Sequence, residues 1–357
     1  MADKKRVLVA MSGGVDSSVA AALLLEQGYE VEGVTMQIWP DIADEEERIT
    51  KGCCSLSAVD DARRVAYHLG IRYHVWNFKD LFQQSVIQPF VQEYVAGRTP
   101  NPCIRCNKIV KFEALLTRAL AVGFDYIATG HYGQIDKFGD RYVLKRSASI
   151  EKDQTYALYN LTQHQLQHLL LPCGTMSKPQ LREYAKQKEI PVFDKPDSQE
   201  ICFVRDNDYA GFIEKAGYPS VPGNFIDTKG NVIGRHKGIF HYTVGQRKGL
   251  GMTFGKPMFV VKIDPVANTV TLGDNADTFQ NELFAKELNW IAFDQLPDAG
   301  ISCKVKIRYN GPAQDATVYP ANGGVRVVFD EPVRAVTPGQ SAVFYDGDIV
   351  LGGGIIQ

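Results

Sequence analysis

The feature that most constrains the fold is a regular alternation of short β-rich runs and helical patterns in the first half of the chain. Strands are expected at 6–11, 30–37, 73–77 and 126–129, and helices at 18–26, 57–70, 79–96, 108–122, 161–169 and 178–188. Strands separated by helices of this length predict an α/β fold, a doubly wound parallel sheet with helices on both faces. Ligands of such sheets bind beyond the carboxyl ends of the strands.

The pattern changes near residue 210. After a short helix at 209–215, residues 229–262 contain seven Lys or Arg and no Asp or Glu, and beyond 276 alternating runs such as CKVKIRYN are separated by turn residues. A chain of 357 residues also exceeds what one core usually supports. We therefore expect an α/β domain over 1–208, a small β-rich central domain over 209–275 and a C-terminal β-barrel over 276–357.

Composition excludes several classes of protein. With 45% hydrophobic and 22% charged residues the chain is an ordinary globular protein, and its net charge of −2 offers no general attraction for nucleic acid. No apolar run approaches the roughly 18 residues of a membrane span, and the start MADKKRVLVAMSGG contains no cleavage site. We expect a cytoplasmic protein that does not enter a membrane.

A loop rich in Gly and Ser follows the first strand, where AMSGGVDSS occupies 10–18 and leads into a helix. Glycines let backbone N–H groups approach an anion, and a helix N-terminus adds unpaired donors. The loop lacks the Gly-Lys-Ser/Thr of a Walker loop and the Gly-x-Gly-x-x-Gly of a Rossmann loop. Its S-G-G-x-D-S resembles the pyrophosphate loop of ATP-dependent adenylating enzymes. Met36 and Gly130 end two later strands and fit the same pocket, although Met36 alone also fits ordinary core packing.

Three cysteines are candidates for chemistry. Cys103 and Cys106 lie in TPNPCIRCNK, which we expect to be a stiff loop between two helices, and nearby Arg and Lys favour their thiolates. Cys202 lies in another polar loop, PDSQEICF. A single Cys-x-x-Cys fits half a zinc site, a dithiol or part of an iron–sulfur site, and a closed zinc site is disfavoured because a second pair is missing. We expect the remaining four to be structural: Cys53, Cys54, Cys173 and Cys303.

Taken together, these motifs resemble those of the tRNA-specific 2-thiouridylase family over essentially the whole chain. The matching stretches are AMSGGVDSSVAA, TPNPCIRCNKIVKF, IATGHY, KDQTYAL, PDSQEICF, HYTVGQRKGLG, KIRYN and TPGQ. The resemblance implies an ATP-dependent sulfurtransferase that replaces the 2-oxygen of the wobble uridine in the tRNA anticodon stem-loop with sulfur. It also implies ATP with Mg²⁺, a sulfur-carrier protein or cysteine desulfurase relay as donor, and a monomer.

The resemblance assigns roles to individual residues. Cys106 and Cys202 are implied to be the catalytic cysteines. The implied ATP contacts are Ala10, Met11, Ser12, Gly13, Gly14, Val15, Asp16, Ser17, Met36 and Gly130. The implied tRNA contacts are Asn101, Pro102, Cys103, His131, Lys152, Asp153, Gln154, Arg308, Tyr309 and Gln340.

Cys103 departs from the family pattern, since members that use the purely cysteine-based scheme carry Asp there. Two routes for sulfur are therefore open. In one, Cys202 carries a persulfide and Cys106 resolves the product as a Cys106–Cys202 disulfide. In the other, Cys103, Cys106 and Cys202 hold a [4Fe–4S] cluster whose free iron binds hydrosulfide.

The basic segment 229–262 could neutralise tRNA phosphates, and Phe240, Tyr242 or Tyr309 could stack on unpaired bases, although for each ring taken alone core packing is the favoured role. Other classes remain open at this point. They are a pyrophosphate-loop ligase acting on a small molecule, a nonenzymatic metal or redox module, and a related enzyme that thiolates cytidine. The β-rich second half and Cys202 disfavour the last of these.

Overall fold

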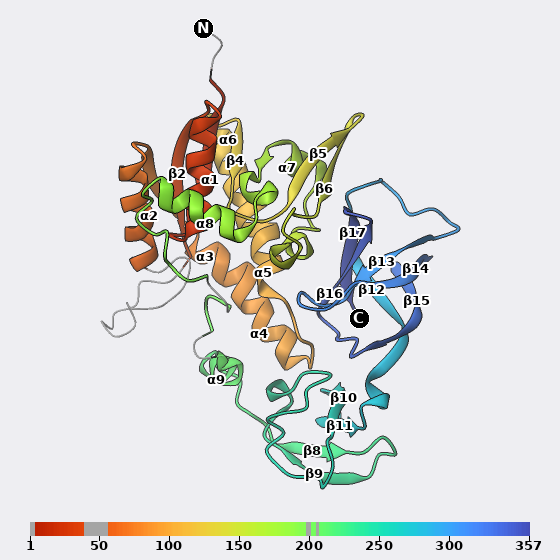
Figure 1. Ribbon diagram of the computed structural model, residues 1–357. Coiled ribbons are helices and arrows are strands. Elements are labelled where there is room, and N and C mark those ends of the chain that lie inside the picture. Colours follow the sequence, from red (N-terminus) through yellow and green to blue (C-terminus); the bar gives the residue numbers. More distant parts are fainter. Residues whose placement is uncertain (1–3, 39–55, 198–200, 205–206) are drawn as a thin grey trace. The chain divides into compact units, whose positions relative to one another are not determined.

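The computed structural model describes residues 4–38, 56–197, 201–204 and 207–357 (Figure 1). Contacts divide the chain into two compact units that interleave along the sequence. The first unit comprises Met1–Val86, Cys103–Phe203 and Asp348–Val350, and the second comprises Ile87–Pro102, Val204–Gly347 and Leu351–Gln357. The three expected domain boundaries stay a prediction.

A five-stranded parallel sheet forms the centre of the first unit, in the order β3-β2-β1-β4-β7. Strand β1 therefore lies between β2 on one side and β4 on the other, so the strand order reverses at the β1/β4 pair. This confirms the predicted α/β fold class. The strands are β1 (Arg6–Ala10), β2 (Glu30–Gln37), β3 (Arg72–Asn77), β4 (Tyr126–Ala128) and β7 (Leu169–Leu170).

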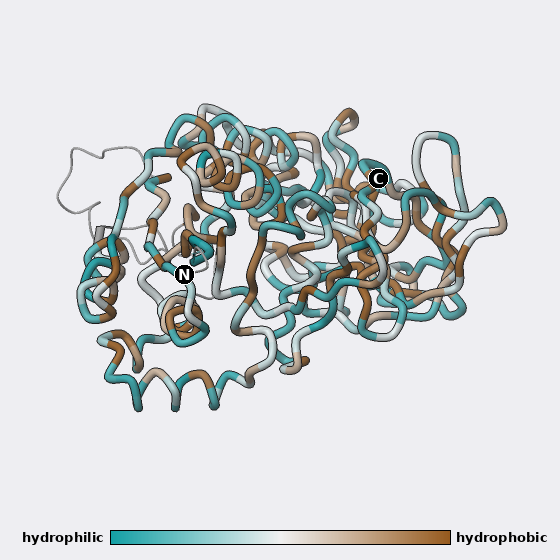
Figure 2. The backbone as a smooth tube through the Cα atoms, turned by 90° about the horizontal axis from the view of Figure 1, so that it is seen from above, coloured by the Kyte–Doolittle hydropathy of each residue, from teal (hydrophilic) through white to brown (hydrophobic). Residues whose placement is uncertain are grey.

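Helices cover the central strand β1 because it is apolar on both faces. Val7 and Val9 of β1 face a core shared by α1 (Val15–Glu26), α2 (Leu56–His68) and α8 (Lys178–Gln187). Leu8, which lies between them and is also fully buried, faces the opposite side. Figure 2 shows the hydropathy of the tube changing every few residues, as expected for elements with one buried face.

Between β3 and β4 the chain is helical, but not as two simple helices. It forms α3 (Lys79–Phe82), a π-helical segment Gln83–Ile87, α4 (Gln88–Val95), α5 (Pro102–Arg105), a π-helical segment Cys106–Ala114 and α6 (Leu115–Ala121). The prediction of a loop around Cys103 and Cys106 is therefore wrong. Proline is well tolerated in the first turn of a helix, so Pro102 starts a helical turn here and does not prolong a loop.

Some elements of the first unit had no signal in the predicted pattern. A hairpin forms from β5 (Gln134–Phe138) and β6 (Arg141–Lys145), and Ile349 and Val350 pair with β6. The expected helix at 161–169 is shorter, because α7 (Gln163–Gln167) ends before β7 begins. The remaining short 3-10 segments are Ile150–Lys152, Thr155–Ala157 and Pro172–Thr175.

The second unit contains a small mixed sheet in the order β10-β11-β8-β9, built from β8 (Gly223–Ile226), β9 (Val232–His236), β10 (Phe259–Asp264) and β11 (Thr269–Gly273). Phe225, Val260, Val270 and Leu272 are fully buried in its core. In the same unit, Phe90 and Tyr94 of α4 pack against Tyr209 and Phe212 of α9 (Tyr209–Lys215). The chain also forms short 3-10 segments, Ile239–His241 and Ala276–Thr278.

A closed six-stranded barrel follows, which confirms the predicted C-terminal barrel. The strands pair in the order β12-β15-β14-β13-β16-β17, and β17 returns to pair with β12. Closure pairs the two end strands of the barrel with each other. The barrel strands are β12 (Phe279–Trp290), β13 (Ile301–Lys306), β14 (Gln314–Ala321), β15 (Gly324–Arg334), β16 (Ser341–Asp346) and β17 (Ile349–Ile356). Across the described residues, no helix has the length and apolarity needed to cross a membrane.

Candidate active site

The Gly- and Ser-rich loop joins β1 to α1 and is held by its own hydroxyl groups. The Ser12 N–H donates to Ser17 Oγ over 3.1 Å, and Ser18 Oγ donates to the Gly14 carbonyl over 2.8 Å. Gly14 precedes the first residue of α1, and no described side chain caps that helix end. The first-turn N–H groups and the positive end of the helix dipole are therefore directed at the loop.

Two glycines let the loop approach its neighbours closely. Gly13 has a φ of +66°, and a Cβ there would lie 2.3 Å from the carbonyl oxygen of Ala58 in α2. A Cβ on Gly130, just beyond β4, would lie 2.6 Å from backbone atoms of Asp16 and Ser17. The loop and Gly130 therefore meet where the strand order reverses, which is where a doubly wound sheet binds its ligand.

Met36 is less informative. It lies in β2 beside β1, and its side chain is buried, as is that of Met11. The geometry brings Met36 to the same end of the sheet as the loop, but packing explains its side chain. An ATP contact at Met36 stays a prediction.

Asp16 of the loop is held by two residues that are distant in sequence. Its Oδ1 accepts a hydrogen bond from Tyr132 Oη at 2.9 Å and lies 2.6 Å from Lys178 Nζ. Burial, followed by the charge of Asp16, raises the pKa of Tyr132, so its hydroxyl remains a donor. Lys178 is the first residue of α8, and its side chain is 11% exposed.

Lys178 also contacts a second carboxylate. Its Nζ lies 2.7 Å from Asp197 Oδ1, and Asp197 is further paired with Arg182 at 3.0 Å and Lys152 at 3.1 Å. Burial raises the pKa of Asp197, but hydrogen bonds from Lys178 and Lys152 outweigh burial and lower it below its ordinary value. The Asp197 carboxylate is therefore ionised at neutral pH.

A third contact joins the same region to the loop. Lys195 Nζ donates to the Gly13 carbonyl over 2.9 Å and lies 2.6 Å from Asp61 Oδ2 in α2. Burial raises the pKa of Asp61, but hydrogen bonds from Lys195 and Arg64 lower it overall. Sequence reasoning missed Tyr132, Lys178 and Lys195 in this role, because each pairs with a residue more than a hundred positions away. It also missed Asp197, whose partners Lys152, Lys178 and Arg182 lie 15 to 45 positions away.

Cys103 and Cys106 lie in consecutive helical segments, α5 and the π-helical segment Cys106–Ala114. Cys103 is exposed and Cys106 is partly buried. The two residues are three positions apart, so they share one side of the helical turn. The intervening Ile104 is buried, and the Arg105 guanidinium donates to the Ser85 carbonyl. The basic side chains expected around the thiols are present, with Arg105 and Lys108 exposed.

Cys202 lies in a turn and is partly buried. The next residue, Phe203, is 3% exposed and packs edge-to-face on Phe82 of α3, with ring centroids 5.8 Å apart. Phe203 therefore fixes the backbone directly after Cys202. Residues 198–200 and 205–206 lie outside the described part of the chain.

The predicted iron–sulfur ligands do not fit a cluster in this arrangement. Across the described ranges, which include all three cysteines, no group of three or more His, Cys, Asp or Glu side chains could hold a metal ion. Cys103, Cys106 and Cys202 therefore do not form one ligand set here.

The other cysteines differ from these in their surroundings. Cys173 is fully buried beneath the loop, where its Sγ donates to the Asp16 carbonyl over 3.3 Å, and burial raises its thiol pKa. Burial likewise raises the pKa of Cys303 in the barrel to about 12. Both are protonated at neutral pH, in keeping with a structural role. Cys53 and Cys54 lie outside the described residues.

Comparison with known proteins decides the family. Residues 5–206 match a family model described as tRNA methyl transferase HUP domain, 210–274 the tRNA methyl transferase PRC-barrel domain, and 280–356 the aminomethyltransferase beta-barrel domain. The chain is 62% identical over 358 residues to tRNA-specific 2-thiouridylase MnmA of Acetivibrio thermocellus, with 99% of each chain covered. It is 55% identical to tRNA-specific 2-thiouridylase MnmA of Clostridioides difficile, with 99% of this chain and 98% of the relative covered.

The chain belongs to the tRNA-specific 2-thiouridylase family. Among solved structures, a 4-thiouridine synthetase–RNA complex with bound ATP matches with 20% identity and a TM-score of 0.37, covering 56% of this chain and 45% of that chain. At that TM-score the match carries no part of the assignment, which rests on the relatives alone.

In this 2-thiouridylase family member, four residues that are expected to contact tRNA make hydrogen bonds or ion pairs within the first unit. Lys152 pairs with Asp197, Asp153 accepts from Thr155 Oγ1 at 2.8 Å, and Gln154 Oε1 accepts the Tyr132 N–H at 2.9 Å. His131 Nδ1 lies 2.8 Å from Thr129 Oγ1, directly beyond β4. Of these four residues, Gln154 bonds to the backbone of Tyr132. A direct tRNA contact at each of the four stays a prediction.

The remaining expected tRNA contacts lie in the second unit, apart from Cys103. Gln340 Nε2 donates to the Thr99 carbonyl over 2.8 Å, and Thr99 N–H donates to the Pro338 carbonyl over 2.9 Å, so TPGQ fixes the backbone just before Asn101 and Pro102. The Arg308 guanidinium donates to the Val244 and Ala335 carbonyls and to Thr337 Oγ1. Its neighbour Tyr309 is 37% exposed.

Two of the aromatic residues considered for base stacking cannot take that role in this arrangement. Phe240 and Tyr242 are 7% and 3% exposed, and Tyr242 packs in the core of the small mixed sheet. Burial of an aromatic ring beside Phe225 satisfies its apolar surface without RNA. Of the three rings considered, Tyr309 is the exposed one, and Lys306 Nζ lies 5.7 Å from the centroid of its ring. Stacking of Tyr309 on a base stays a prediction.

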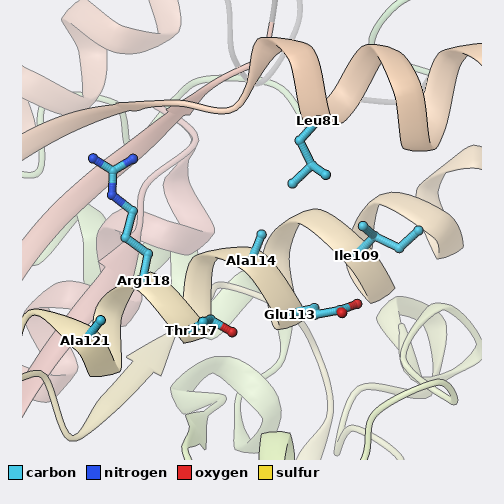
Figure 3. A pocket seen from close by; sticks show the side chains of 7 residues that line it. All are labelled: Leu81, Ile109, Glu113, Ala114, Thr117, Arg118 and Ala121. Carbon is cyan, nitrogen blue, oxygen red and sulfur yellow. The ribbon is translucent and has the colours of Figure 1, made fainter.

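A hollow of about 420 Å³ lies on the first unit (Figure 3), and no residue of the loop lines it. Leu81 of α3 faces it from one side and residues of Cys106–Ala114 and α6 from the other, with Arg118 at one end. The Arg118 guanidinium stacks over the Trp76 ring at 4.4 Å. None of the residues that line the hollow is an expected ATP contact. They are Leu81, Ile109, Glu113, Ala114, Thr117, Arg118 and Ala121.

Proposed function

We propose that this chain is a tRNA-uridine 2-sulfurtransferase that uses ATP to convert the wobble uridine of its tRNA substrates to 2-thiouridine. The observation that carries the proposal is identity of 62% over 99% of both chains to a tRNA-specific 2-thiouridylase. The cradle formed by the loop and Gly130 supports it, because adenylation requires a site that binds a leaving pyrophosphate.

In the first step, the 2-oxygen of the uridine attacks the α-phosphorus of ATP, and pyrophosphate leaves. The donors that fit this step are the first-turn N–H groups of α1 and the hydroxyl groups of Ser12 and Ser17. Such preorganised donors stabilise the charge that develops on the leaving group. Mg²⁺ would neutralise part of the phosphate charge and accompany ATP as a substrate complex.

In the second step, the terminal sulfur of a Cys202 persulfide attacks the activated C2, and AMP leaves with the former 2-oxygen. The Cys106 thiolate then attacks Cys202 Sγ, which breaks the S–S bond to the nucleobase and leaves 2-thiouridine and a Cys106–Cys202 disulfide. An external thiol reduces this disulfide before the next cycle. We favour this route because the three candidate cluster ligands form no ligand set in the described residues.

The persulfide must be supplied from outside, by a sulfur-carrier protein or a cysteine desulfurase. We propose that the enzyme works as a monomer in the cytoplasm, on the anticodon stem-loop, with Tyr309 and the basic segment 229–262 on the RNA-binding surface. Exposure of Tyr309 supports this placement.

The test is release of pyrophosphate from ATP in the presence and absence of tRNA. We expect release with a tRNA that carries uridine at the wobble position and none with the same tRNA carrying cytidine there. Mass spectrometry of the nucleosides should detect 2-thiouridine when a persulfide donor is added. Release without tRNA would instead favour a ligase acting on a small molecule.

A further inference from the structure

The segment Lys195–Asp197 is tied to the ATP loop by charge at both of its ends. Lys195 donates to the Gly13 carbonyl, and Asp197 shares the ammonium group of Lys178 with Asp16 of the loop. Cys202 follows Asp197 after four intervening residues. Lys178 thus contacts both the loop, through Asp16, and the segment that leads to the proposed sulfur-carrying cysteine, through Asp197.

The surroundings of Asp197 are those of a bound anion. Three cationic groups converge on its carboxylate, with Lys178 and Arg182 on Oδ1 at 2.7 and 3.0 Å and Lys152 on Oδ2 at 3.1 Å. The Lys178 and Asp197 side chains are 11% and 24% exposed, so solvent screens their attraction only in part. Lysine and arginine side chains in such a cluster are also the usual partners of phosphate oxygens.

Lys178 is the member of this cluster within reach of the loop. Its Nζ lies 2.6 Å from Asp16 Oδ1, and Asp16 follows the glycines that form the cradle. A lysine side chain has a flexible four-carbon stem, so the ammonium group can turn about Asp16 without movement of α8. A phosphate group at the loop would be a more highly charged partner for it than the single carboxylate of Asp197.

We propose that Lys178 is a phosphate-binding residue and that Asp197 competes with ATP for it. Binding of ATP transfers Lys178 from Asp197 to a phosphate oxygen, and Asp197 keeps Lys152 and Arg182. No covalent bond changes in this exchange. Because such competition is reciprocal, ATP loosens the hold on the segment that leads to Cys202, and that hold weakens ATP binding.

This inference rests on the proposed function, since it requires ATP at the loop. The test measures the dissociation constant of a nonhydrolysable ATP analogue with Mg²⁺, without tRNA or a sulfur donor, by calorimetry. The variants are Lys178→Met, Lys178→Arg and Asp197→Asn in the full chain. Lys188→Met is the matched control, because Lys188 follows the same helix and also pairs with a carboxylate, that of Glu26.

Substitutions at Lys178 and at Asp197 should change the dissociation constant of the ATP analogue in opposite directions. We expect K178M to raise the dissociation constant about tenfold or more and D197N to lower it about threefold to tenfold. K178R should stay near the wild-type value and K188M should not change it. An ion pair that only stabilises the fold would give weaker binding, or no change, in both K178M and D197N.

Unchanged or weaker binding in D197N overturns the proposal, even where K178M does not fold. Failure of the proposed function gives a different pattern. In that case, the opposite shifts in analogue binding would appear while tRNA-dependent pyrophosphate release and 2-thiouridine did not. Conversely, full thiolation together with an unchanged D197N dissociation constant would remove this inference alone.

Discussion

The ATP loop and the Cys103–Cys106 turn are held in different ways. The loop is fixed by tertiary contacts with distant parts of the first unit, namely Ala58, Gly130 and Lys178. The two thiols lie instead on a local helical turn, where Cys103 is exposed. The proposed adenylation site thus lies in a preformed cradle, whereas the proposed sulfur transfer uses cysteines from two separate segments of the chain. The two halves of the chemistry should therefore be separable by mutation.

The largest effect should come from removing a thiol. Cys202→Ser and Cys106→Ser should each lower 2-thiouridine formation about a thousandfold or more, because each removes a nucleophile. Both should keep tRNA-dependent pyrophosphate release within about threefold of wild type, because the ATP loop contains neither residue. Cys303→Ser, a change in the barrel, is the control and should preserve both activities. Loss of pyrophosphate release in both thiol variants would show that the two halves are not separable.

The next effect should come from the cradle. Gly130→Ala places a methyl group against the backbone of Asp16 and Ser17, so the first turn of α1 must move. We expect weaker ATP binding by about a hundredfold and a loss of unfolding free energy of about 1–3 kcal/mol. Gly139→Ala is the control, since its Cβ would meet nothing within 4 Å. Its positive φ of 58° should cost about 1 kcal/mol of stability, without any change in ATP affinity. Equal loss of affinity in both variants would contradict the role of Gly130.

A smaller effect concerns the sheet on which the loop is built. The Glu32 side chain is 4% exposed and pairs with Arg6, Arg72 and His74. Burial raises its pKa, but hydrogen bonds from His74 and Arg6 and the charge of Arg72 outweigh burial, so the pKa lies below its ordinary value. The ionised carboxylate therefore stabilises the fold at pH values above the unfolded pKa of about 4.3, and this is lost as the pH falls through the lower folded pKa.

Glu32→Gln should accordingly lower the free energy of unfolding by about 1–3 kcal/mol at pH 7. Urea titrations at a series of pH values should show the difference from wild type shrinking below about pH 4. Glu30→Gln is the control, because Glu30 pairs with the same two arginines but is 45% exposed, and it should cost no more than about 0.5 kcal/mol. If the difference in unfolding free energy between wild type and Glu32→Gln did not change with pH, the ionic explanation would be contradicted.

The smallest effect should come from Cys103→Asp, which restores the residue of the cysteine-based scheme. If sulfur travels on Cys202 alone, thiolation from a persulfide donor should fall no more than about tenfold. It should also proceed at that rate in iron-free protein. Loss of activity in iron-free wild type, with recovery after anaerobic addition of iron and sulfide, would instead make Cys103 a cluster ligand.

Much of the nucleotide side of the molecule could be predicted from sequence because its signals are local. The strand at 30–37 and the helix at 209–215 have the bounds that hydrophobic periodicity predicts, and the loop is contiguous. Lys178 could not be found in this way. Locally it is the residue after the helix cap Ser177, and its partners Asp16 and Asp197 are brought to it only by the packing of α8 on the sheet.

The Cys103–Cys106 turn was mispredicted for a different reason. Two prolines within four residues are typical of a loop, but the second lies where a helix tolerates proline best. Phe240 and Tyr242 illustrate a further limit of prediction from sequence. The sequence alone does not distinguish an aromatic residue in a small hydrophobic core from one that stacks on an RNA base. The burial of Tyr242 follows from the pairing of β8 with β11, a contact between residues more than forty positions apart.

The interleaving of the two units has a consequence for synthesis on the ribosome. Helix α4 belongs to the second unit, where Phe90 and Tyr94 pack against Tyr209 and Phe212. At typical translation rates, α4 would leave the ribosome roughly 10 s before these partners do. Its aromatic face is a target for chaperones during that interval. For the same reason no single cut in the chain yields two complete units.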